Sequence, residues 1–363
     1  MKITFLLPTG GDIPVGGYKI VYQYANELAS LGHFVTVSHR MLRAPGASIF
    51  RQYARYVKAL VRGSWKPSAW FQTDPRVRIQ FVMDFTPENV GANDVLIATS
   101  WITAEYSAGL PESCGRKFYF VQDYEHFMSG DESVRERIAK TFRLGFKMIV
   151  ISPSCRQLVE DCGGVVHAEV PNGLDHDLYR TTIPIESPQR LGIGFPCRDE
   201  SFKRTSDAVD ALRGVREDKS LGDYWYWSFG SKRPSYFPDW IDFYVRPSDT
   251  ELVDLYNKSA VFVVPSQYEG WGLPGSEAMC CGAALASSDS GGVRAYAIHD
   301  RNALISTPMD VEALAKNITL LLSDGPLRNR LATAGHADIK QFTWARGSRA
   351  LEQALLDDTD HHA

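Results

Sequence analysis

The chain has 363 residues, of which 44% are hydrophobic and 23% charged, and its formal net charge is −4. These values are ordinary for a globular protein and exclude disordered and fibrous classes. The negative net charge gives no electrostatic support for binding nucleic acid, and the length favours two domains. The six cysteines form no CxxC pair and no zinc spacing, so we expect free thiols and no metal site.

Nothing in the sequence indicates export or membrane insertion. The N-terminal segment Met1–Pro8 is too short for a signal peptide, because Thr9 and two glycines interrupt it. No apolar run approaches 18 residues, the length of a membrane-spanning helix. We therefore expect a cytoplasmic protein.

Short apolar runs alternate with amphipathic stretches in the first half of the chain, which is the pattern of a parallel α/β domain. We expect strands at 3–7, 34–38, 79–82, 95–98, 118–121 and 148–151. A glycine-bearing loop, Thr9–Gly17, follows the first of these strands. An amphipathic helix is expected from Tyr18 to Leu31, with Gly32 at its end.

The segment between Glu27 and Asp74 contains seven Lys or Arg residues and no acidic residue. On a helix through this segment, one face would be basic and formed by Arg51, Arg55, Lys58 and Arg62. The apolar positions of the same helix are Phe50, Tyr53, Val57, Leu60 and Val61. Such a helix could bind an anionic membrane surface. The alternative is a solvated helix that packs on its own domain.

Polar residues follow the strand expected at 118–121, where side chains can face a ligand. Gln122 and Asp123 come directly after this strand, and His126 lies three residues further on. A glutamine cannot act as a general base, but it can form hydrogen bonds with a sugar. His126 can equally be a surface histidine beside acidic neighbours.

The second half repeats the α/β pattern after a polar, proline-bearing linker at 181–188. We expect its strands at 191–195, 224–229, 243–245, 261–264 and 284–286. The sequence therefore predicts two Rossmann-like domains that face each other across a cleft. We place the first domain at 1–183 and the second at 184–343.

The stretch from Glu269 to Glu277 joins the end of a strand to the start of a helix near Leu273. Its glycines allow the backbone to approach a ligand closely, and a helix N-terminus favours a phosphate. Acidic side chains beside a phosphate are useful when they accept hydrogen bonds from hydroxyl groups. The segment therefore suits a ligand that carries both phosphate and hydroxyls.

The spacing of the two glutamates in EGWGLPGSEAM resembles the donor-binding signature of the retaining family 4 glycosyltransferases, which have the GT-B fold. The resemblance implies that Glu269 contacts hydroxyls of the donor sugar and that Glu277 binds the ribose of the nucleotide. It also implies that the backbone of Trp271, Gly272 and Leu273 contacts the diphosphate.

A second signature follows the first strand of the second half. Arg198 and Lys203 lie five positions apart, like the Arg and Lys with which family 4 enzymes bind the donor diphosphate. Two cations can stabilise the charge of the leaving diphosphate without a metal. The chain departs from the pattern at Cys197, which precedes Arg198 where a glycine is usual, and at Arg204, which replaces a common glycine. A solvated basic loop is the alternative interpretation.

Other segments resemble the family less specifically. Gly16 and Gly17 resemble its Gly-Gly loop, which approaches the donor phosphates and the acceptor. Gln122 stands where many members have a histidine before the aspartate, and FYFVQDYE resembles a bacterial subgroup of surface-glycan rhamnosyltransferases. The loop that ends at Gly291-Gly292 continues with Val293-Arg294 rather than the family's Pro-Glu. By resemblance, the final helix and tail, 344–363, return to the N-terminal domain.

One further motif mimics a metal site. Asp175 and Asp177 form the DxD pattern that binds a metal in a different glycosyltransferase fold. The segment from Asn172 to Asp175 resembles the family's NGvD turn, and that turn already accounts for Asp175. We therefore expect no metal there.

The resemblance implies a retaining, metal-independent glycosyltransferase without a cofactor. We expect it to transfer L-rhamnose or another hexose from a nucleoside-diphosphate donor to a glycan or a lipid-linked glycan, in the cytoplasm or on the inner face of the cell membrane. The candidate catalytic residues are Glu269, Arg198, Lys203, Gln122 and Asp123. The candidate donor-binding residues are Gly16, Gly17, Trp271, Gly272, Leu273 and Glu277.

Two other functions stay open at this point. A sugar-nucleotide epimerase with the GT-B fold would use the same cleft with acid–base groups in place of an acceptor. A catalytically silent nucleotide-sugar-binding protein is the second alternative, although the intact charged residues disfavour it. A dehydrogenase is disfavoured because the region from Gly10 to Gly17 lacks a GxGxxG motif.

Overall fold

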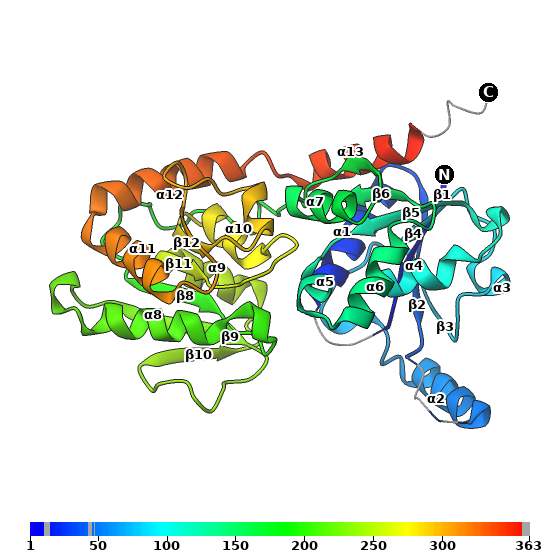
Figure 1. Cartoon of the computed structure of the whole chain (residues 1–363), viewed down its shortest axis with the longest axis horizontal. Helices are drawn as coiled ribbons and strands as arrows, with labels where there is room; N and C mark the ends of the chain where they lie inside the picture. The colour runs from blue at the N-terminus through cyan, green and yellow to red at the C-terminus, as the bar shows by residue number, and fades with distance from the viewer. Residues whose placement is uncertain (11–14, 43–45, 47, 358–363) are drawn as a thin grey trace. The chain divides into compact units, whose positions relative to one another are not determined.

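A computed structural model describes residues 1–10, 15–42, 46 and 48–357. The chain divides into two compact units, each built on one parallel sheet (Figure 1). The first unit contains residues 1–151 and 155–172 and the chain from Trp344 onward. The second unit contains residues 152–154 and 173–343.

The sheet of the first unit has seven parallel strands in the order β3-β2-β1-β4-β5-β6-β7. Its strands are β1 (Lys2–Leu7), β2 (Phe34–Arg40), β3 (Arg78–Val82), β4 (Val95–Ala98), β5 (Arg116–Val121), β6 (Lys147–Val150) and β7 (Val166–Glu169). The six predicted strands are confirmed, and each predicted end lies within two residues of the observed one. The short strand β7 was missed, because all four of its side chains are only half-buried.

Helices connect these strands and surround the sheet (Figure 1). They are α1 (Gly16–Ser30), α2 (Ile49–Arg62), α3 (Pro87–Val90), α4 (Trp101–Ala108), α5 (Glu125–Ser129), α6 (Glu132–Thr141) and α7 (Pro153–Asp161), with short 3₁₀ turns at Pro67–Ala69 and Glu112–Cys114. The C-terminal helix α13 (Trp344–Leu356) also packs here, since the ring of Trp344 lies 5.3 Å from that of Tyr24 on α1. Arg116 on β5 donates to the carbonyl of Leu355 at 3.0 Å. The predicted return of the final helix to the N-terminal part of the fold is therefore confirmed.

The sheet of the second unit has six parallel strands in the order β10-β9-β8-β11-β12-β13. They are β8 (Gly192–Pro196), β9 (Trp225–Gly230), β10 (Ile241–Val245), β11 (Ser259–Val264), β12 (Ala284–Ser288) and β13 (Leu304–Ser306). The helices are α8 (Thr205–Glu217), α9 (Asp249–Lys258), α10 (Leu273–Cys280), α11 (Val311–Ser323) and α12 (Gly325–Ile339), with 3₁₀ turns at Ser201–Lys203, Lys219–Leu221 and Gly292–Ala295. The five predicted strands are confirmed, and the three-residue β13 was missed.

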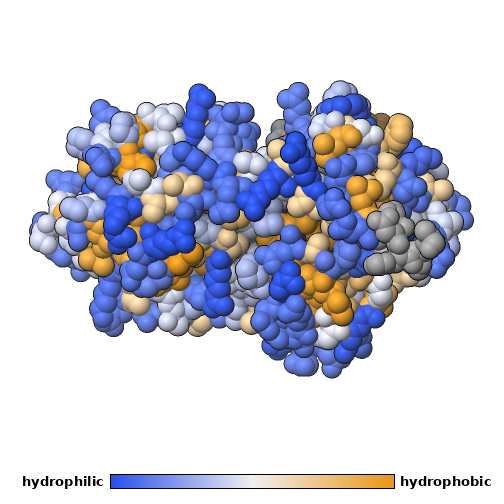
Figure 2. Space-filling model, turned by 90° about the horizontal axis from the view of Figure 1, so that it is seen from above, coloured by the Kyte–Doolittle hydropathy of each residue, from blue (hydrophilic) through white to orange (hydrophobic). Residues whose placement is uncertain are grey.

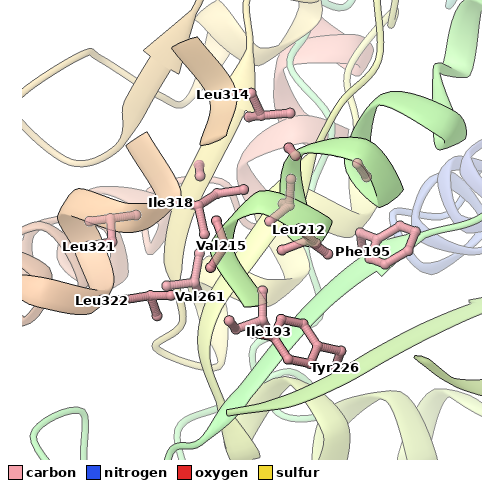
Figure 3. Packing of buried hydrophobic residues seen from close by; sticks show 14 of the residues in the cluster. Ile193, Phe195, Leu212, Val215, Tyr226, Val261, Leu314, Ile318, Leu321 and Leu322 are labelled. Atoms are coloured by element: carbon pink, nitrogen blue, oxygen red, sulfur yellow. The ribbon is translucent and has the colours of Figure 1, made fainter. Parts of the chain in front are cut away.

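A hydrophobic core lies between this sheet and its helices (Figure 3). Ile193 and Val261 point from the sheet toward Leu212 on α8 and Ile318 on α11, and each of the four is fully buried. Burial of an aliphatic side chain of this size contributes about 1.5–3 kcal/mol. This core fixes the ends of β8 and β11, from which the candidate active-site loops leave.

The two sheets share one strand order, with the first strand of each in the third place. In both sheets the direction of strand addition reverses at that strand, between β1 and β4 and between β8 and β11. Ligands of open parallel sheets bind at the carboxyl ends of the strands at such a reversal. The topology therefore favours ligand sites at the loops after β1, β4, β8 and β11.

Hydrogen bonds join the linker just before the predicted domain boundary, 183/184, to the second unit. Residues 173–183, which we assigned to the first domain, are bonded to the second unit. The backbone N–H groups of Thr182 and Ile183 donate to the amide oxygen of Asn257 at 2.6 and 3.2 Å. Leu174 also donates to the carbonyl of Phe342 at 2.9 Å.

The surface and the cysteines need only brief description. On the face shown in Figure 2, hydrophobic residues occur in small groups among hydrophilic ones. All six cysteines are free thiols. Of the helices that the structure describes, none has the length and apolar character needed to cross a bilayer.

Candidate active site

One ion pair joins the loops that follow β8 and β11. Lys203 closes the 3₁₀ turn after β8, and its Nζ lies 2.9 Å from Oε2 of Glu269 in the loop after β11. Ser266 donates to the other oxygen of the same carboxylate at 2.8 Å. Each side chain of the pair is only 15% exposed, so water screens this attraction less than it screens a surface ion pair. The structure therefore brings together two of the predicted catalytic residues at the reversal of strand order.

The loop 290–292 holds the backbone of Glu269 in place. Glu269 donates to the carbonyl of Ser290, and Gly292 donates to the carbonyl of Glu269, both at 2.9 Å. A Cβ atom on Gly292 would lie only 2.4 Å from the Glu269 carbonyl oxygen, so a glycine is required there. Arg294, which stands where the family signature has a glutamate, pairs with Asp289 at 2.6 Å.

The turn before α10 confirms the predicted helix start at Leu273. Gly272 precedes the helix in the left-handed conformation, with φ of 91°, and its carbonyl accepts a hydrogen bond from Tyr296 at 2.9 Å. The Trp271 side chain is buried against Tyr296 and Phe342 and donates to the hydroxyl of Ser276 at 3.2 Å. The indole therefore stabilises the turn, and only the backbone of Trp271 can face a ligand.

The start of α8 explains the departure from the family pattern at residue 204. Arg204 has φ of 52°, a left-handed conformation that costs a residue with a Cβ more than it costs glycine. Its guanidinium forms two contacts of 2.9 Å with the carboxylate of Asp207, whose side chain is 7% exposed. This ion pair offsets part of the backbone strain.

The N-termini of the helices differ in whether a side chain caps them. Within the described chain, α1, α5, α8 and α10 begin without a side-chain cap, and three of these helices, α1, α8 and α10, follow β1, β8 and β11. Helices α2, α4, α6, α9, α11 and α12 each begin with a Ser or Asp cap. An uncapped helix start offers backbone N–H groups and a partial positive charge. Such N-termini suit the phosphates of a ligand.

Arg198 is held differently from Lys203. Its side chain is exposed, donates to the carbonyl of Cys197 at 3.0 Å and lies over the ring of Phe229 at 5.4 Å. The hydroxyl of Thr205 accepts from the N–H of Arg198 and donates to its carbonyl, at 3.0 and 2.9 Å. The backbone at Arg198 is therefore fixed, while its guanidinium faces solvent.

Glu277 lies in the buried part of α10. It is 8% exposed, and the hydroxyl of Tyr256 donates to its Oε2 at 3.2 Å. Burial and the neighbouring Glu277 carboxylate both raise the pKa of Tyr256, so this hydroxyl stays protonated and remains a donor. Burial, followed by the charge of Glu277, raises the pKa of Tyr179 in the same way.

In the first unit, two of the predicted site residues, Gly17 and Gln122, lie side by side. Gly16 begins α1, and a Cβ atom on Gly17 would lie 3.8 Å from Oε1 of Gln122. That oxygen is buried and accepts no hydrogen bond within the described chain, although buried acceptors are usually satisfied. Asp123 lies 3.4 Å from His126, and both side chains are exposed. Residues 11–14 of the glycine-bearing loop lie outside the described residues.

Sequence reasoning missed three residues that shape the site, Ser266, Tyr256 and Tyr296. Ser266 was detectable, because a short polar side chain stood three residues before a candidate glutamate at a strand end. No sequence pattern identifies Tyr256 and Tyr296. A buried tyrosine cannot be distinguished from an ordinary core residue until the direction of its hydroxyl is known.

Among the residues that the structure describes, no group of three or more His, Cys, Asp or Glu side chains could hold a metal ion. Asp175 accepts from the N–H groups of Asp177 and Leu178 at 3.1 and 3.0 Å. This is the arrangement of a polar turn.

Known proteins resemble this chain in sequence and fold. Residues 238–338 match the family model described as glycosyl transferases group 1. A glycogen synthase of Mycobacterium tuberculosis is 32% identical over 331 residues, which span 86% of this chain and 74% of that protein. An O-antigen chain mannosyltransferase B of Escherichia coli is 36% identical over 105 residues, but these span only 29% of this chain and 27% of that protein.

The fold has relatives among solved structures as well. HepE of Anabaena, solved in complex with UDP and glucose, superimposes with a TM-score of 0.72 at 17% identity, over 98% of this chain and 100% of HepE. This likeness confirms the predicted GT-B fold. The family match and the long alignment to glycogen synthase show that the chain belongs to the group 1 glycosyltransferases.

Proposed function

We propose that this glycosyltransferase moves a sugar from a nucleoside diphosphate to a hydroxyl of a growing bacterial surface glycan, with retention of anomeric configuration. The observation that carries the proposal is the Lys203–Glu269 ion pair at the reversal of strand order. The complex of HepE with UDP supports a nucleotide donor, and the O-antigen relative supports a surface-glycan acceptor. The family 4 resemblance supports retention.

The donor would be held by groups of both signs. Glu269 would accept hydrogen bonds from the sugar hydroxyls, and Glu277 would bind the ribose. Lys203 has three N–H donors, so one can hold Glu269 while another contacts a phosphate oxygen. The backbone of Trp271, Gly272 and Leu273 would complete the phosphate site at the uncapped start of α10.

The proposed transfer takes place on one face of the sugar. The acceptor oxygen forms a bond to the anomeric carbon as the bond from that carbon to the diphosphate oxygen breaks. The bonding electrons stay with the diphosphate, one of whose oxygens takes the acceptor proton. Lys203 and Arg198 would stabilise the developing negative charge, and proximity would lower the barrier further. This course requires neither a carboxylate nucleophile nor a metal.

The remaining candidate residues, Gly16, Gly17, Gln122 and Asp123, belong to the first unit. Gln122 has a buried oxygen that accepts no hydrogen bond within the described chain, so a sugar hydroxyl could donate to it. By the family resemblance, Gly16 and Gly17 would approach the donor phosphates and the acceptor, and Asp123 would take part in catalysis. We propose that the acceptor is a glycan or a lipid-linked glycan and that the reaction takes place in the cytoplasm.

L-Rhamnose is the first sugar to test, and another hexose is the alternative. Thermal unfolding with UDP, GDP, dTDP and ADP should identify the base, because a nucleotide at a hundred times its Kd stabilises by about 2.7 kcal/mol. Turnover of the matching sugar nucleotides, with the product anomer determined by NMR, then tests the reaction. An inverted product contradicts retention. Free epimerised donor identifies an epimerase, and binding without turnover identifies a silent binding protein.

Chelation tests the part of the proposal that concerns metals. Activity should survive EDTA, because Arg198 and Lys203 supply the positive charge that a metal would otherwise supply. Complete loss of activity on chelation, with recovery on adding Mg²⁺ or Mn²⁺, would reject the metal-free course.

A further inference from the structure

Helix α2 differs from every other long helix of the first unit in how little of it is covered. None of its 14 residues is buried. Tyr56 joins it to the body of the unit: its hydroxyl donates to the carbonyl of Phe81 at 2.9 Å, and its ring stacks on Phe81 at 5.5 Å. Figure 1 shows the helix standing off from the sheet, beyond β2 and β3. One of the two alternatives for this helix was packing on its own domain. Such packing covers only the edge of the helix that carries Tyr56.

The helix presents a broad apolar face to solvent. Its exposed apolar side chains are Ile49 at 75%, Phe50 at 84%, Tyr53 at 60%, Val57 at 39%, Leu60 at 41% and Val61 at 82% exposure. At 3.6 residues per turn, these six positions fall within about 120° of the helix circumference. A contiguous exposed patch of this kind marks an interaction surface.

The opposite face of α2 is basic. Arg51, Arg55, Lys58 and Arg62 fall within about 60° of the circumference, and all four are exposed. No acidic residue occurs between Glu27 and Asp74, so no neighbour in the sequence neutralises this face. Gln52, Tyr56 and Ala59 form the half-covered edge between the two faces. The described residues of the unit therefore leave both the apolar and the basic face exposed.

A partner for both faces must combine an apolar interior with negative charge above it. An anionic lipid bilayer has this composition, and a basic amphipathic helix lies in its interface with the apolar side chains among the acyl chains. Fourteen residues span about 21 Å, which is shorter than a hydrocarbon core of about 30 Å. The helix is therefore suited to lie on a membrane and unsuited to cross it.

We propose that α2 is a membrane-docking helix that binds the first unit to an anionic lipid surface. Phe50, Tyr53 and Val61 enter the outer hydrocarbon region, and the basic side chains extend toward the lipid phosphates. The inference does not depend on the proposed transfer reaction. Where the acceptor is lipid-linked, the same contact would place it and the enzyme at one surface.

Flotation of the purified chain with vesicles tests this proposal. We expect binding to vesicles of phosphatidylglycerol and phosphatidylcholine at low salt, and much weaker binding to phosphatidylcholine alone or in 0.5 M salt. A quadruple variant, Arg51→Gln, Arg55→Gln, Lys58→Gln and Arg62→Gln, should lower the partition coefficient on the order of 10²-fold or more, since each charge contributes about fivefold.

A matched control removes the same charge elsewhere. The quadruple variant Arg213→Gln, Lys219→Gln, Lys316→Gln and Arg330→Gln changes four exposed residues of the second unit. It should bind vesicles within about threefold of wild type. A third variant, Phe50→Asp with Val61→Asp, should bind neither vesicle type, and circular dichroism should show that all three variants keep the wild-type fold.

Several results would overturn the proposal. Wild-type protein that does not float with anionic vesicles at low salt excludes a lipid partner. Equal losses in the two quadruple variants attribute binding to net charge alone, and unchanged binding by the Asp double variant excludes insertion of the apolar face. A dimer of wild type in solution that the Asp variant dissociates identifies a second copy of the chain as the partner. Turnover of a water-soluble acceptor should be the same in wild type and the α2 variants, which separates a failure here from a failure of the proposed reaction.

Discussion

The two units have the same strand order, yet the carboxyl ends of their first strands carry different chemistry. After β8 and β11, opposite charges meet in the Lys203–Glu269 ion pair. After β1, the polar groups are uncharged: Thr9 contacts the hydroxyl of Tyr18 at 2.8 Å, and its carbonyl lies 2.9 Å from Nδ1 of His39. The topology thus marks the same position in both sheets, and the side chains differ there.

The neutral state of His39 has a structural cause. A carbonyl can only accept, so Nδ1 donates to Thr9 and Nε2 accepts from Tyr22 at 3.0 Å. Burial lowers the pKa of His39 to about 4, although its hydrogen bond to Thr9 acts in the opposite direction. A diphosphate needs positive charge, whereas uncharged donors and acceptors are sufficient to bind hydroxyl groups. This difference is the one that the proposed function expects between a donor on the second unit and an acceptor on the first.

The largest expected effect concerns the charged side of this contrast. Lys203→Ala should lower kcat about 10²–10³-fold, the usual scale for removing one group that stabilises transition-state charge. Lys219→Ala, which changes an exposed lysine of the same unit, is the control and should leave kcat unchanged. Steady-state kinetics with the identified donor make the measurement. A Lys203→Ala enzyme with wild-type kcat would mean that this lysine only positions Glu269.

The neutral side of the contrast predicts a pH dependence of stability. His39 has a folded-state pKa of about 4 against an ordinary value of 6.5, so the unfolded chain binds more protons between these values. The free energy of unfolding should therefore fall by up to about 3 kcal/mol as the pH drops from 6.5 to 4. His39→Gln should flatten this slope, whereas His126→Gln, at an exposed histidine, should keep it. Urea unfolding at several pH values makes the comparison, and equal slopes in wild type and His39→Gln would show that folding does not lower the pKa of His39.

The third prediction separates nucleotide binding from chemistry within the second unit. Glu277→Ala should weaken binding of the free nucleotide about ten- to a hundredfold, because a hydrogen bond to a charged group contributes about 1.5–3 kcal/mol. Tyr256→Phe, which removes only the hydroxyl that contacts Glu277, should have a smaller effect. Calorimetric titration gives both affinities. Wild-type affinity in Glu277→Ala would disprove the ribose assignment.

The fold was largely predictable because local patterns determined it. Buried strands such as 95–98 and 261–264 are uninterrupted apolar runs, and the turn at Gly272 is readable from its glycines. The missed strands β7 and β13 are only four and three residues long, and their pairing is stabilised by neighbours distant in sequence. Such strands have no periodicity of their own.

The candidate site was predictable as a set of residues but not as a set of contacts. Glu269 and Lys203 were both identified by their motifs, yet their pairing depends on β8 and β11 being neighbours in the sheet. The hydrogen bond from Tyr256 to Glu277 depends on how α9 packs near α10, which no motif records. The exposure of α2 was visible only as amphipathicity, and the structure was needed to show that neither face is covered.

The smallest expected effect is a change in the free energy of unfolding at Arg204, the non-glycine residue at the start of α8 beside Lys203. In Arg204→Gly, relief of the left-handed backbone should stabilise by about 1 kcal/mol. The same change leaves the buried carboxylate of Asp207 without its guanidinium partner. Loss of a buried partner costs up to about 3–5 kcal/mol, and because the Arg204 side chain is 30% exposed we expect about 2 kcal/mol. The net result should be a loss of about 1 kcal/mol.

A double variant distinguishes the two opposing terms. Asp207→Asn removes the charge that Arg204 neutralises, so Arg204→Gly with Asp207→Asn should unfold at or above the wild-type urea concentration. If Arg204→Gly alone is more stable than wild type, the ion pair contributes less than the backbone strain. In that case the arginine does not stabilise this turn, and a positive charge close to the proposed phosphate site is the remaining physical reason for a cation there. Turnover of the single variant then decides the matter: a fall in kcat without a fall in stability would mean that Arg204, like Lys203 and Arg198, stabilises the charge of the leaving diphosphate in the proposed reaction.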